Sequence, residues 1–331
     1  MFHGGRLEDA RRQFPDAPGP PLDLSTGINP IPYPVPALSP ESFTRLPEPG
    51  ALAALSQAAA AAYGARDAAC VVPAPGAQSL ISLLPYVVRA RTVAVLGPTY
   101  AEYAAAWSTA GAAVTEVTTF EELGHADIAV LCNPNNPDGR TISPARIAGL
   151  ASRVSGRGGL VVVDEAFADL ESGGLSLVPT LPDRGAIVLR SFGKAFGLGG
   201  VRLGFAVAAR DVASALRAAL GPWPVSGAAI AIGTAALGDT RWRQAAAARL
   251  ADDGTRLDSL LTQAGLSILG GTRLFRLCGA ADAAATHDRL GRAGIVVRRF
   301  PARPAWLRFG LPGLASDWDR LASAVLRDKA R

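Results

Sequence analysis

Short apolar runs alternate with helical patterns between residues 51 and 210, and this alternation constrains the fold more than any other feature. Five of the runs are rich in β-branched residues and read as buried strands: Thr92–Leu96, Asp127–Cys132, Leu160–Asp164, Ala186–Arg190 and Leu203–Val207. Strands spaced in this way predict an α/β fold with a mainly parallel sheet and helices on both faces. Such sheets bind ligands at the carboxyl ends of their strands. The loops after the strands are therefore the expected place for a functional site.

The remainder of the chain predicts a second, smaller domain. A chain of 331 residues exceeds the usual size of one compact unit. Alternating prolines predict an extended N-terminal arm over residues 1–48, which we assign to the small domain, and residues 49–222 form the predicted large domain. A Gly-Pro-Trp-Pro break at 221–224 then precedes a long helical pattern over 228–264, which opens a small α/β C-terminal domain over 223–331. The strands and helices predicted in that domain are Arg273–Leu277, Ile295–Arg298, Trp306–Phe309, Ala281–Ala293 and Ser316–Arg327.

The composition argues against nucleic-acid, membrane and metal partners. The net charge is +5, but the arginines are scattered along the chain and form few clusters. No apolar run reaches the roughly 18 residues of a membrane span, and residues 1–20 do not resemble an export leader, so we expect a soluble, cytoplasmic protein. Cys70, Cys132 and Cys278 are isolated, which favours reduced thiols over disulfides or a zinc site.

Lysine is almost absent from this arginine-rich sequence, which contains only Lys194 and Lys329. Arginine can replace lysine wherever only a positive charge is needed, but its guanidinium stays protonated and cannot form an imine with an aldehyde. Lys329 lies close to the C-terminus, where a solvated charge explains it. The internal Lys194 therefore invites a chemical explanation, although chance survival of a surface lysine is the alternative.

Several of the loops after the strands carry polar or glycine-rich sequences. Gly76-Ala77-Gln78-Ser79 follows an apolar run and opens a helix, which offers backbone N–H groups and a positive helix end to a phosphate. Tyr100 follows the next strand, where its ring could stack on a flat cofactor or simply pack against the protein. The Asn-Pro-Asn-Asn-Pro-Asp-Gly segment over 133–139 is more elaborate than a plain turn requires.

Two further loops bring charged groups to the same edge of the predicted sheet. Asp164 and Glu165 end an apolar strand, where a partly desolvated carboxylate calls for a cationic partner such as a pyridinium nitrogen. Ser191 and Lys194 follow the next strand, and Arg202 comes eight residues later. A hydroxyl, an amine and a guanidinium on one loop suit a phosphate with an aldehyde nearby.

Other catalytic motifs are not matched. Gly193-Lys194 is followed by Ala195 where a P-loop needs Ser or Thr, and no GxGxxG follows the first strand. His3, His125 and His287 have no GxSxG partner for serine hydrolysis.

Taken together and in this order, the loops resemble those of the fold-type-I pyridoxal 5′-phosphate (PLP) enzymes. The motifs are N-P-N-N-P-x-G, D-E-A-F and S-F-G-K-x-F-G-L-x-G-x-R, which recur at intervals of about 30 residues. The resemblance covers nearly the whole chain and is strongest to the branch of histidinol-phosphate aminotransferases and the threonine-phosphate decarboxylases of cobalamin biosynthesis. It implies a large domain with a mostly parallel, seven-stranded type of sheet, a smaller C-terminal domain, and a homodimer.

The resemblance also implies roles for individual residues. Lys194 would form the imine with PLP, Asp164 would keep the ring nitrogen protonated, and Tyr100 would stack on the ring. Asn136 would contact the phenolic oxygen of the cofactor and border the substrate. The cofactor phosphate would be held by Gly76, Ala77, Gln78, Ser191 and Arg202.

The same resemblance suggests substrate contacts outside the large domain. Arg308 matches the position that binds the substrate α-carboxylate, and Arg298 matches an arginine that meets a substrate phosphate. A salt bridge for Arg308, and solvated charges for Arg298 and Arg299, are the alternatives. The arm would cover the active site, so Asn29 and His3 are further candidates for substrate contact.

Two departures distinguish the branches. Phe167 stands where many aminotransferases carry a tyrosine, and Leu46 replaces the tyrosine with which histidinol-phosphate aminotransferases reach the partner subunit's cofactor. The segments 3–5 and 23–30 instead resemble the cobalamin-pathway decarboxylases. The sequence thus leaves three hypotheses: decarboxylation of L-threonine O-3-phosphate, transamination of a phosphorylated substrate such as histidinol phosphate, and a non-catalytic module that senses a ligand or acts as a scaffold.

Overall fold

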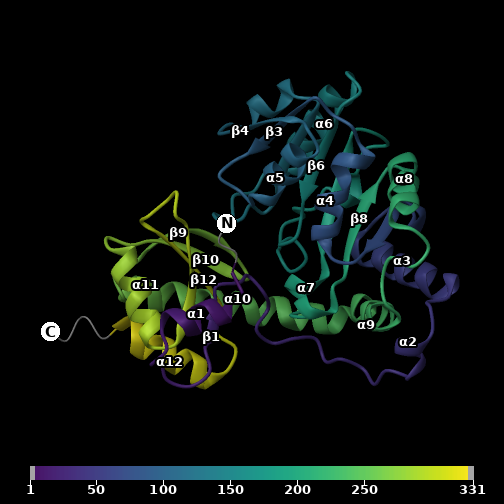
Figure 1. Ribbon diagram of the computed structural model, residues 1–331. Helices are drawn as coiled ribbons and strands as arrows, with labels where there is room; N and C mark the ends of the chain where they lie inside the picture. Colours follow the sequence, from purple (N-terminus) through teal and green to yellow (C-terminus); the bar gives the residue numbers. More distant parts are fainter. Residues whose placement is uncertain (1–3, 327–331) are drawn as a thin grey trace. The chain divides into compact units, whose positions relative to one another are not determined.

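The computed structural model describes residues 4–326, which divide into two compact units. The large unit comprises residues 33–136 and 140–243, and the small unit comprises the described parts of residues 1–32, 137–139 and 244–331. Each unit is built around its own sheet (Figure 1). Within the described part of the chain, no helix has the length and apolar character needed to cross a membrane.

The large unit contains a seven-stranded sheet in the order β2-β8-β7-β6-β5-β3-β4. The prediction of a mostly parallel sheet is confirmed, since β4, β3, β5, β6 and β7 pair in parallel. Only β8 opposes its neighbours, β7 and β2. The strands are β2 (Val71–Ala74), β3 (Thr92–Leu96), β4 (Ala113–Val117), β5 (Ile128–Cys132), β6 (Leu160–Asp164), β7 (Ala186–Ser191) and β8 (Gly204–Ala208).

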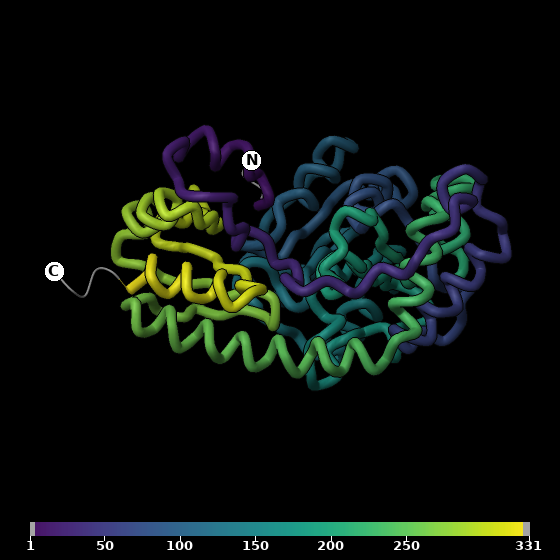
Figure 2. Tube along the Cα trace, turned by 90° about the horizontal axis from the view of Figure 1, so that it is seen from below, coloured from purple at the N-terminus to yellow at the C-terminus, as the bar shows by residue number. Residues whose placement is uncertain are grey.

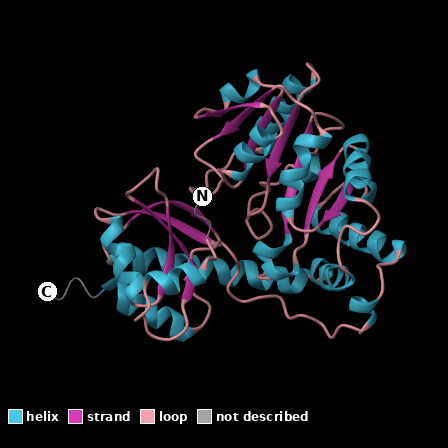
Figure 3. Ribbon diagram, viewed as in Figure 1, coloured by secondary structure: helices cyan, strands magenta, loops and turns pink. Residues whose placement is uncertain are grey.

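Helices flank this sheet (Figure 3) and bury its apolar faces. Every residue of β5, β6 and β8 is buried, as expected for strands covered on both sides. The edge strand β4 is mostly exposed, and Thr115 and Glu116 interrupt its apolar residues, so no continuous apolar run predicted it. The main helices are α3 (Pro49–Tyr63), α4 (Ala77–Val87), α5 (Glu102–Thr109), α6 (Pro144–Ser155), α8 (Arg210–Leu220) and α9 (Gly227–Gly238).

The small unit contains a five-stranded sheet in the order β1-β11-β12-β10-β9. Its outer strand β1 (Leu22–Leu24) comes from the N-terminal segment and pairs in parallel with β11 (Ile295–Arg299). The extended conformation predicted for the arm is wrong for residues 7–13, which form helix α1. Leu24 of β1 lies in the core of the small unit. The remaining elements are β9 (Ser267–Thr272), β10 (Phe275–Gly279), β12 (Trp306–Gly310), α11 (Ala283–Arg292) and α12 (Ala315–Leu326).

The single long helix predicted over 228–264 is two helices, α9 and α10 (Thr240–Gln263), which follow one another along the chain (Figure 2). The break falls at Asp239, which leaves helical geometry after Gly238. The carboxylate of Asp239 accepts a hydrogen bond of 2.9 Å from the N–H of Trp242 and so caps the first turn of α10.

The boundaries of the compact units lie at 32/33 and 243/244, whereas the sequence divided the chain at 48/49 and 222/223. Aromatic packing explains why the two intervening segments join the large unit. The ring of Tyr33 meets Phe196 and Trp242 edge to face, with centroid separations of 6.2 and 5.3 Å, and Phe196 stacks on Trp242. Such contacts add stability beyond the area that they bury.

A buried ion cluster lies at the ends of β6 and β7. Arg190 contacts both Glu165, at 2.5 Å, and Asp169, and all three side chains are almost completely buried. Glu165 also accepts hydrogen bonds from the Ser176 hydroxyl and the Leu177 N–H, both at 2.6 Å. Removing the arginine would leave two carboxylates buried without their cationic partner.

We therefore expect Arg190→Met to lower the free energy of unfolding by about 3–5 kcal/mol. The matched control is Arg146→Met, because Arg146 pairs with Glu121 at the surface and such pairs contribute about 0–1 kcal/mol. Urea unfolding of the cofactor-free proteins measures both values. Equal losses in the two variants would contradict the assigned role of the buried cluster.

Candidate active site

The carboxyl ends of the parallel strands bring the predicted cofactor residues to one edge of the large unit. β3, β5, β6 and β7 run in the same direction, so the loops that follow them emerge together. These loops, with the ends of β6 and β7, carry Tyr100, Asn136, Asp164, Ser191 and Lys194. The sequence prediction placed all five at strand ends, and the structure has them there.

The start of α4 and the loop before β8 together form a cradle. Gly76 caps the helix with a φ of +83°, and a Cβ there would lie 2.7 Å from Nη2 of Arg202. A Cβ on Gly204 would collide with the backbone nitrogen of Ala77, and the strand register pairs Gly204 with Ser191. The cradle thus joins the helix N-terminus, a guanidinium and a hydroxyl, the groups that hold a phosphate.

Arg202 has an unusual backbone conformation. It is the one non-glycine residue among 4–326 with a positive φ, at +56°, and its Nη1 donates to the carbonyl of Gly199 at 3.1 Å. Left-handed conformations cost energy for residues with a Cβ and cluster at functional sites. Here the conformation accompanies a guanidinium packed against Gly76.

Asp164 is buried at the end of β6. Burial raises the pKa of its carboxyl, and the N–H of Ala166, which donates to Oδ1 at 2.9 Å, opposes this shift. The Tyr103 hydroxyl, the charge of Lys194 and the Cys132 thiol act in the same direction as Ala166. A positive charge on a bound ring would favour the ionised form further.

The resemblance assigns Asp164, and not the adjacent Glu165, to the ring nitrogen of the cofactor. Neighbouring residues of a strand point to opposite faces of a sheet. Glu165 contacts Arg190 in the ion cluster, whereas Asp164 lies beside Cys132 and Tyr103. Asp164 is therefore the candidate for the ring nitrogen.

Lys194 lies on the short helix α7 (Phe192–Ala195), directly after β7. Its Nζ is 5.5 Å from the centre of the Phe167 ring, and its charge acts on Asp164. The aromatic ring occupies the position where the resemblance expects a tyrosine in many aminotransferases. The amine thus lies beside an apolar face and near a buried carboxylate.

The loop after β3 is tied to the cradle by side-chain hydrogen bonds. The Tyr100 hydroxyl donates to Oε1 of Gln78 at 3.0 Å, and Nε2 of Gln78 is 3.4 Å from Oε2 of Glu102. Tyr100 is thereby oriented by the first turn of α4. The side chain of Gln78 orients Tyr100, whereas its backbone N–H is one of the N–H groups in the first turn of α4.

In the asparagine-rich loop over 133–139, two asparagines hold the backbone and a third is placed where it could contact a ligand. Asn133 bridges the backbone of Ile142 and Leu175, and Asn135 donates to the carbonyl of Pro98 at 3.0 Å. Both asparagines are fully buried, whereas Asn136 is only partly buried. Of the three, Asn136 remains the candidate for contact with a ligand.

The predicted substrate residues belong to the small unit. Arg308 is buried, and its Nη2 donates to the carbonyl of Ser25 at 2.9 Å. Arg298 is its direct cross-strand partner on β11. Burial and the charge of Arg298 lower the pKa of Arg308 to about 9, while Asp23 opposes the shift. Two arginines held opposite each other favour an anion between or beside them.

Asn29 and His3 were the other candidates for substrate contact. Asn29 is buried in the small unit, where its Oδ1 accepts hydrogen bonds from Arg249 at 2.8 Å and from the N–H of Ile31 at 3.1 Å. His3 lies outside the described residues.

Sequence reasoning missed three residues that lie beside candidate site residues within their own units. Tyr103 and Cys132 lie beside Asp164, and Ser25 holds Arg308. The strand-end position of Cys132 was a usable signal, because parallel neighbours place it opposite Asp164. The contacts of Tyr103 with Asp164 and of Ser25 with Arg308 join segments distant in sequence, so no local sequence pattern indicates them.

The residues of the large unit fit PLP. A cradle that a Cβ would fill suits the phosphate, a buried carboxylate suits the ring nitrogen, and Lys194 supplies the amine for the aldehyde. Among residues 4–326, no group of His, Cys, Asp and Glu side chains could hold a metal ion.

We expect Gly204→Ala to weaken PLP binding by about 1–3 kcal/mol, because the added methyl group forces the start of α4 away from its position. Gly200→Ala is the control, since a Cβ there meets nothing within 4 Å. Fluorescence titration of the cofactor-free proteins with PLP measures the affinities. The cradle assignment fails if both variants bind PLP as the unmodified protein does.

Comparison with known proteins gives independent information. The chain matches the family model for aminotransferase class I and II over residues 7–325. It is 43% identical to a threonine-phosphate decarboxylase of Sinorhizobium sp., with 99% of this chain and 98% of the relative covered. A threonine-phosphate decarboxylase of Pseudomonas aeruginosa is 42% identical, with 98% and 97% covered. A histidinol-phosphate aminotransferase of Shewanella amazonensis is 31% identical, with 78% and 76% covered.

Solved structures share the fold. A histidinol-phosphate aminotransferase from Sinorhizobium meliloti, in complex with pyridoxal-5′-phosphate, superposes with a TM-score of 0.81 at 22% identity, covering 99% of this chain and 94% of the other. An L-threonine-O-3-phosphate decarboxylase from Porphyromonas gingivalis has a TM-score of 0.75 at 19% identity, with 94% and 100% covered. The predicted fold class is confirmed.

Proposed function

Since this chain belongs to the class I and II aminotransferase family, we propose that it is a PLP-dependent decarboxylase of L-threonine O-3-phosphate. The products are (R)-1-amino-2-propanol O-2-phosphate and CO₂, in the cytoplasmic synthesis of cobalamin. The observation that carries the substrate assignment is the 43% identity to a threonine-phosphate decarboxylase over nearly the whole of both chains. The arrangement of Asp164, Lys194 and the phosphate cradle supports the cofactor assignment.

The residues of the large unit bind and orient the cofactor in this proposal. Gly76, Ala77, Gln78, Ser191 and Arg202 hold its phosphate. PLP, when bound, supplies an electron sink for the bond that breaks at the substrate Cα.

Three side chains of the large unit act on the ring, and Lys194 acts at the reacting carbon. Asp164 keeps the ring nitrogen protonated, Tyr100 stacks on the ring, and Asn136 donates to the phenolic oxygen. Lys194 delivers a proton to Cα after CO₂ leaves. Phe167 offers no hydrogen bond to the phenolic oxygen, which leaves that contact to Asn136.

The residues of the small unit recognise the substrate. Arg308 binds the α-carboxylate, and Arg298 binds the substrate phosphate. Asn29 and His3 belong to the arm, which we propose covers the active site. In the decarboxylation the substrate carboxylate leaves as CO₂. Arg308 would therefore have to orient the bond between Cα and the carboxylate so that this bond is the one aligned with the ring π system.

The decisive experiment supplies the purified protein and PLP with threonine phosphate and no oxo acid. We expect CO₂ release at catalytic rates, and we expect Lys194→Ala to abolish it because no amine remains to move the proton at Cα. The competing function is transamination, which is supported by the 31% identity to a histidinol-phosphate aminotransferase. Glutamate formed only from histidinol phosphate and 2-oxoglutarate, without CO₂ from threonine phosphate, would replace the decarboxylase proposal.

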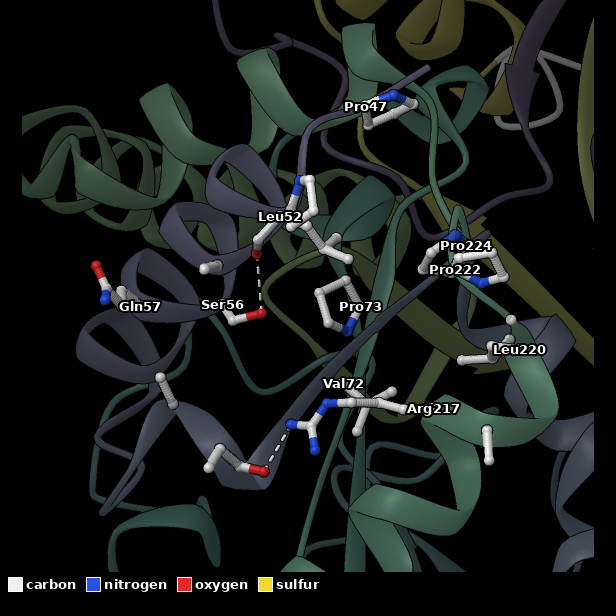
Figure 4. A pocket seen from close by; sticks show the side chains of 16 residues that line it. Pro47, Leu52, Ser56, Gln57, Val72, Pro73, Arg217, Leu220, Pro222 and Pro224 are labelled. Carbon is white, nitrogen blue, oxygen red and sulfur yellow. Dashed lines mark hydrogen bonds between the residues drawn. The ribbon is translucent and has the colours of Figure 1, made fainter.

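We further propose that the protein acts as a homodimer. Phe43, Leu46 and Trp223 are large apolar side chains of the large unit that are 69%, 63% and 55% exposed. Leu46 and Trp223 adjoin in sequence Pro47, Pro222 and Pro224, which line a largely apolar cavity of about 710 Å³ (Figure 4). A second copy of the chain is the partner that would cover this surface.

Dimerisation is tested by sedimentation over a range of concentrations. We expect a stable dimer for the unmodified protein and a monomer for Trp223→Asp, because a buried unpaired charge opposes association. Leu314→Asp is the control, since Leu314 is 66% exposed in the small unit. A monomeric unmodified protein would refute the dimer.

A further inference from the structure

Cys132 lies between Asp164 and the loop after β3, at the end of β5. The parallel register makes Cys132 the direct neighbour of Asp164 on β6. Its Sγ is 3.8 Å from Oδ2 of Asp164 and 3.1 Å from Oγ1 of Thr99. These contacts place a thiol next to a carboxylate in the interior of the large unit.

The carboxylate of Asp164 is approached by donors on both oxygens. The N–H of Ala166 donates to Oδ1 at 2.9 Å, and the thiol of Cys132 donates to Oδ2. The Tyr103 hydroxyl lies close by. A buried carboxylate stays ionised only where donors or cations replace its water, so each of these contacts matters.

The thiol itself is held by the neighbouring loop. Oγ1 of Thr99 lies 2.7 Å from Oδ1 of Asn135 and 3.1 Å from the Cys132 sulfur. Asn135 in turn donates to the carbonyl of Pro98. A chain of polar contacts therefore runs from the asparagine-rich loop through Thr99 and Cys132 to Asp164.

We propose that Cys132 is a positioning residue for Asp164, whose thiol donates to Oδ2 and, with the N–H of Ala166, fixes the charge and orientation of the carboxylate. The thiol suits this task because it stays protonated. Burial and the charge of Asp164 raise the pKa of Cys132, so the sulfur remains a neutral donor. The consequence for the cofactor rests on the proposed function, whereas the effect on Asp164 does not.

Three variants separate hydrogen bonding from packing. Cys132→Val fills the volume without a donor, Cys132→Ser restores a donor, and Cys278→Val changes an equally buried thiol in the small unit. The first measurement uses the cofactor-free protein with ¹³C-labelled aspartate, with the Asp164 carboxyl signal identified by its loss in Asp164→Asn. We expect Cys132→Val to raise the pKa of Asp164, and Cys132→Ser and Cys278→Val to leave it near that of the unmodified protein.

The second measurement follows the visible absorption of bound PLP against pH. We expect Cys132→Val to weaken PLP affinity by about three- to tenfold and to shift the absorption titration, since a less stable carboxylate holds the ring proton less firmly. Cys132→Ser should restore both quantities. A merely structural role would alter the unfolding midpoint while leaving the titration unchanged.

The inference is overturned if Cys132→Val leaves the pKa of Asp164 unchanged, or if Cys132→Ser behaves as Cys132→Val does. Failure of the proposed function has a different signature. In that case threonine phosphate yields no CO₂ with the unmodified protein, while the pKa of Asp164 in the cofactor-free protein still responds to Cys132→Val.

Discussion

The burial of two consecutive carboxylates at the end of β6 is the constraint on which the site depends. The fold neutralises Glu165 with Arg190, a permanent cation on the adjacent strand. It surrounds Asp164 with neutral donors and with the charge of Lys194. Since buried charge needs compensation, the environment of Asp164 favours a cationic ring next to it. Glu165 thus contributes to stability and Asp164 to the candidate active site, because consecutive residues at the end of a strand point to opposite faces of the sheet.

The phosphate cradle depends on backbone geometry as well as on charge. The cradle exists because Gly76 and Gly204 let the start of α4, the end of β7 and Arg202 approach one another more closely than any side chain would allow. Arg202 itself adopts a conformation that is costly for a residue with a Cβ. The large unit accepts this cost where a phosphate is expected. The strands β6 and β8, in which every residue is buried, supply rigidity beside this position.

How far the sequence predicts the molecule depends on how local each signal is. The strands β3 and β6 were predicted to the residue because continuous apolar runs encode burial on both faces. The strands β1, β4 and β9 lack such runs and were missed, and β1 also pairs with a strand far along the chain, β11. The positions of Tyr100, Asp164, Ser191 and Lys194 at or after strand ends were predicted because the strands that precede them have local patterns. The contacts of Tyr103 and Ser25 arise only from packing, which no local pattern records.

The choice between decarboxylation and transamination depends on residues outside the large unit. Both reactions need the cradle, Asp164 and Lys194, so the large unit cannot separate them. The difference lies in which bond at Cα is aligned with the ring, and the group that holds the carboxylate sets that angle. Arg308 is fixed by the Ser25 carbonyl and faced across the strand by Arg298. Because β1 and Ser25 come from the N-terminal segment, that segment helps to set the position of the guanidinium that we propose binds the carboxylate. In the proposed decarboxylase, the small unit would therefore decide the outcome, and its segment 23–30 is one of those that resemble the cobalamin-pathway decarboxylases.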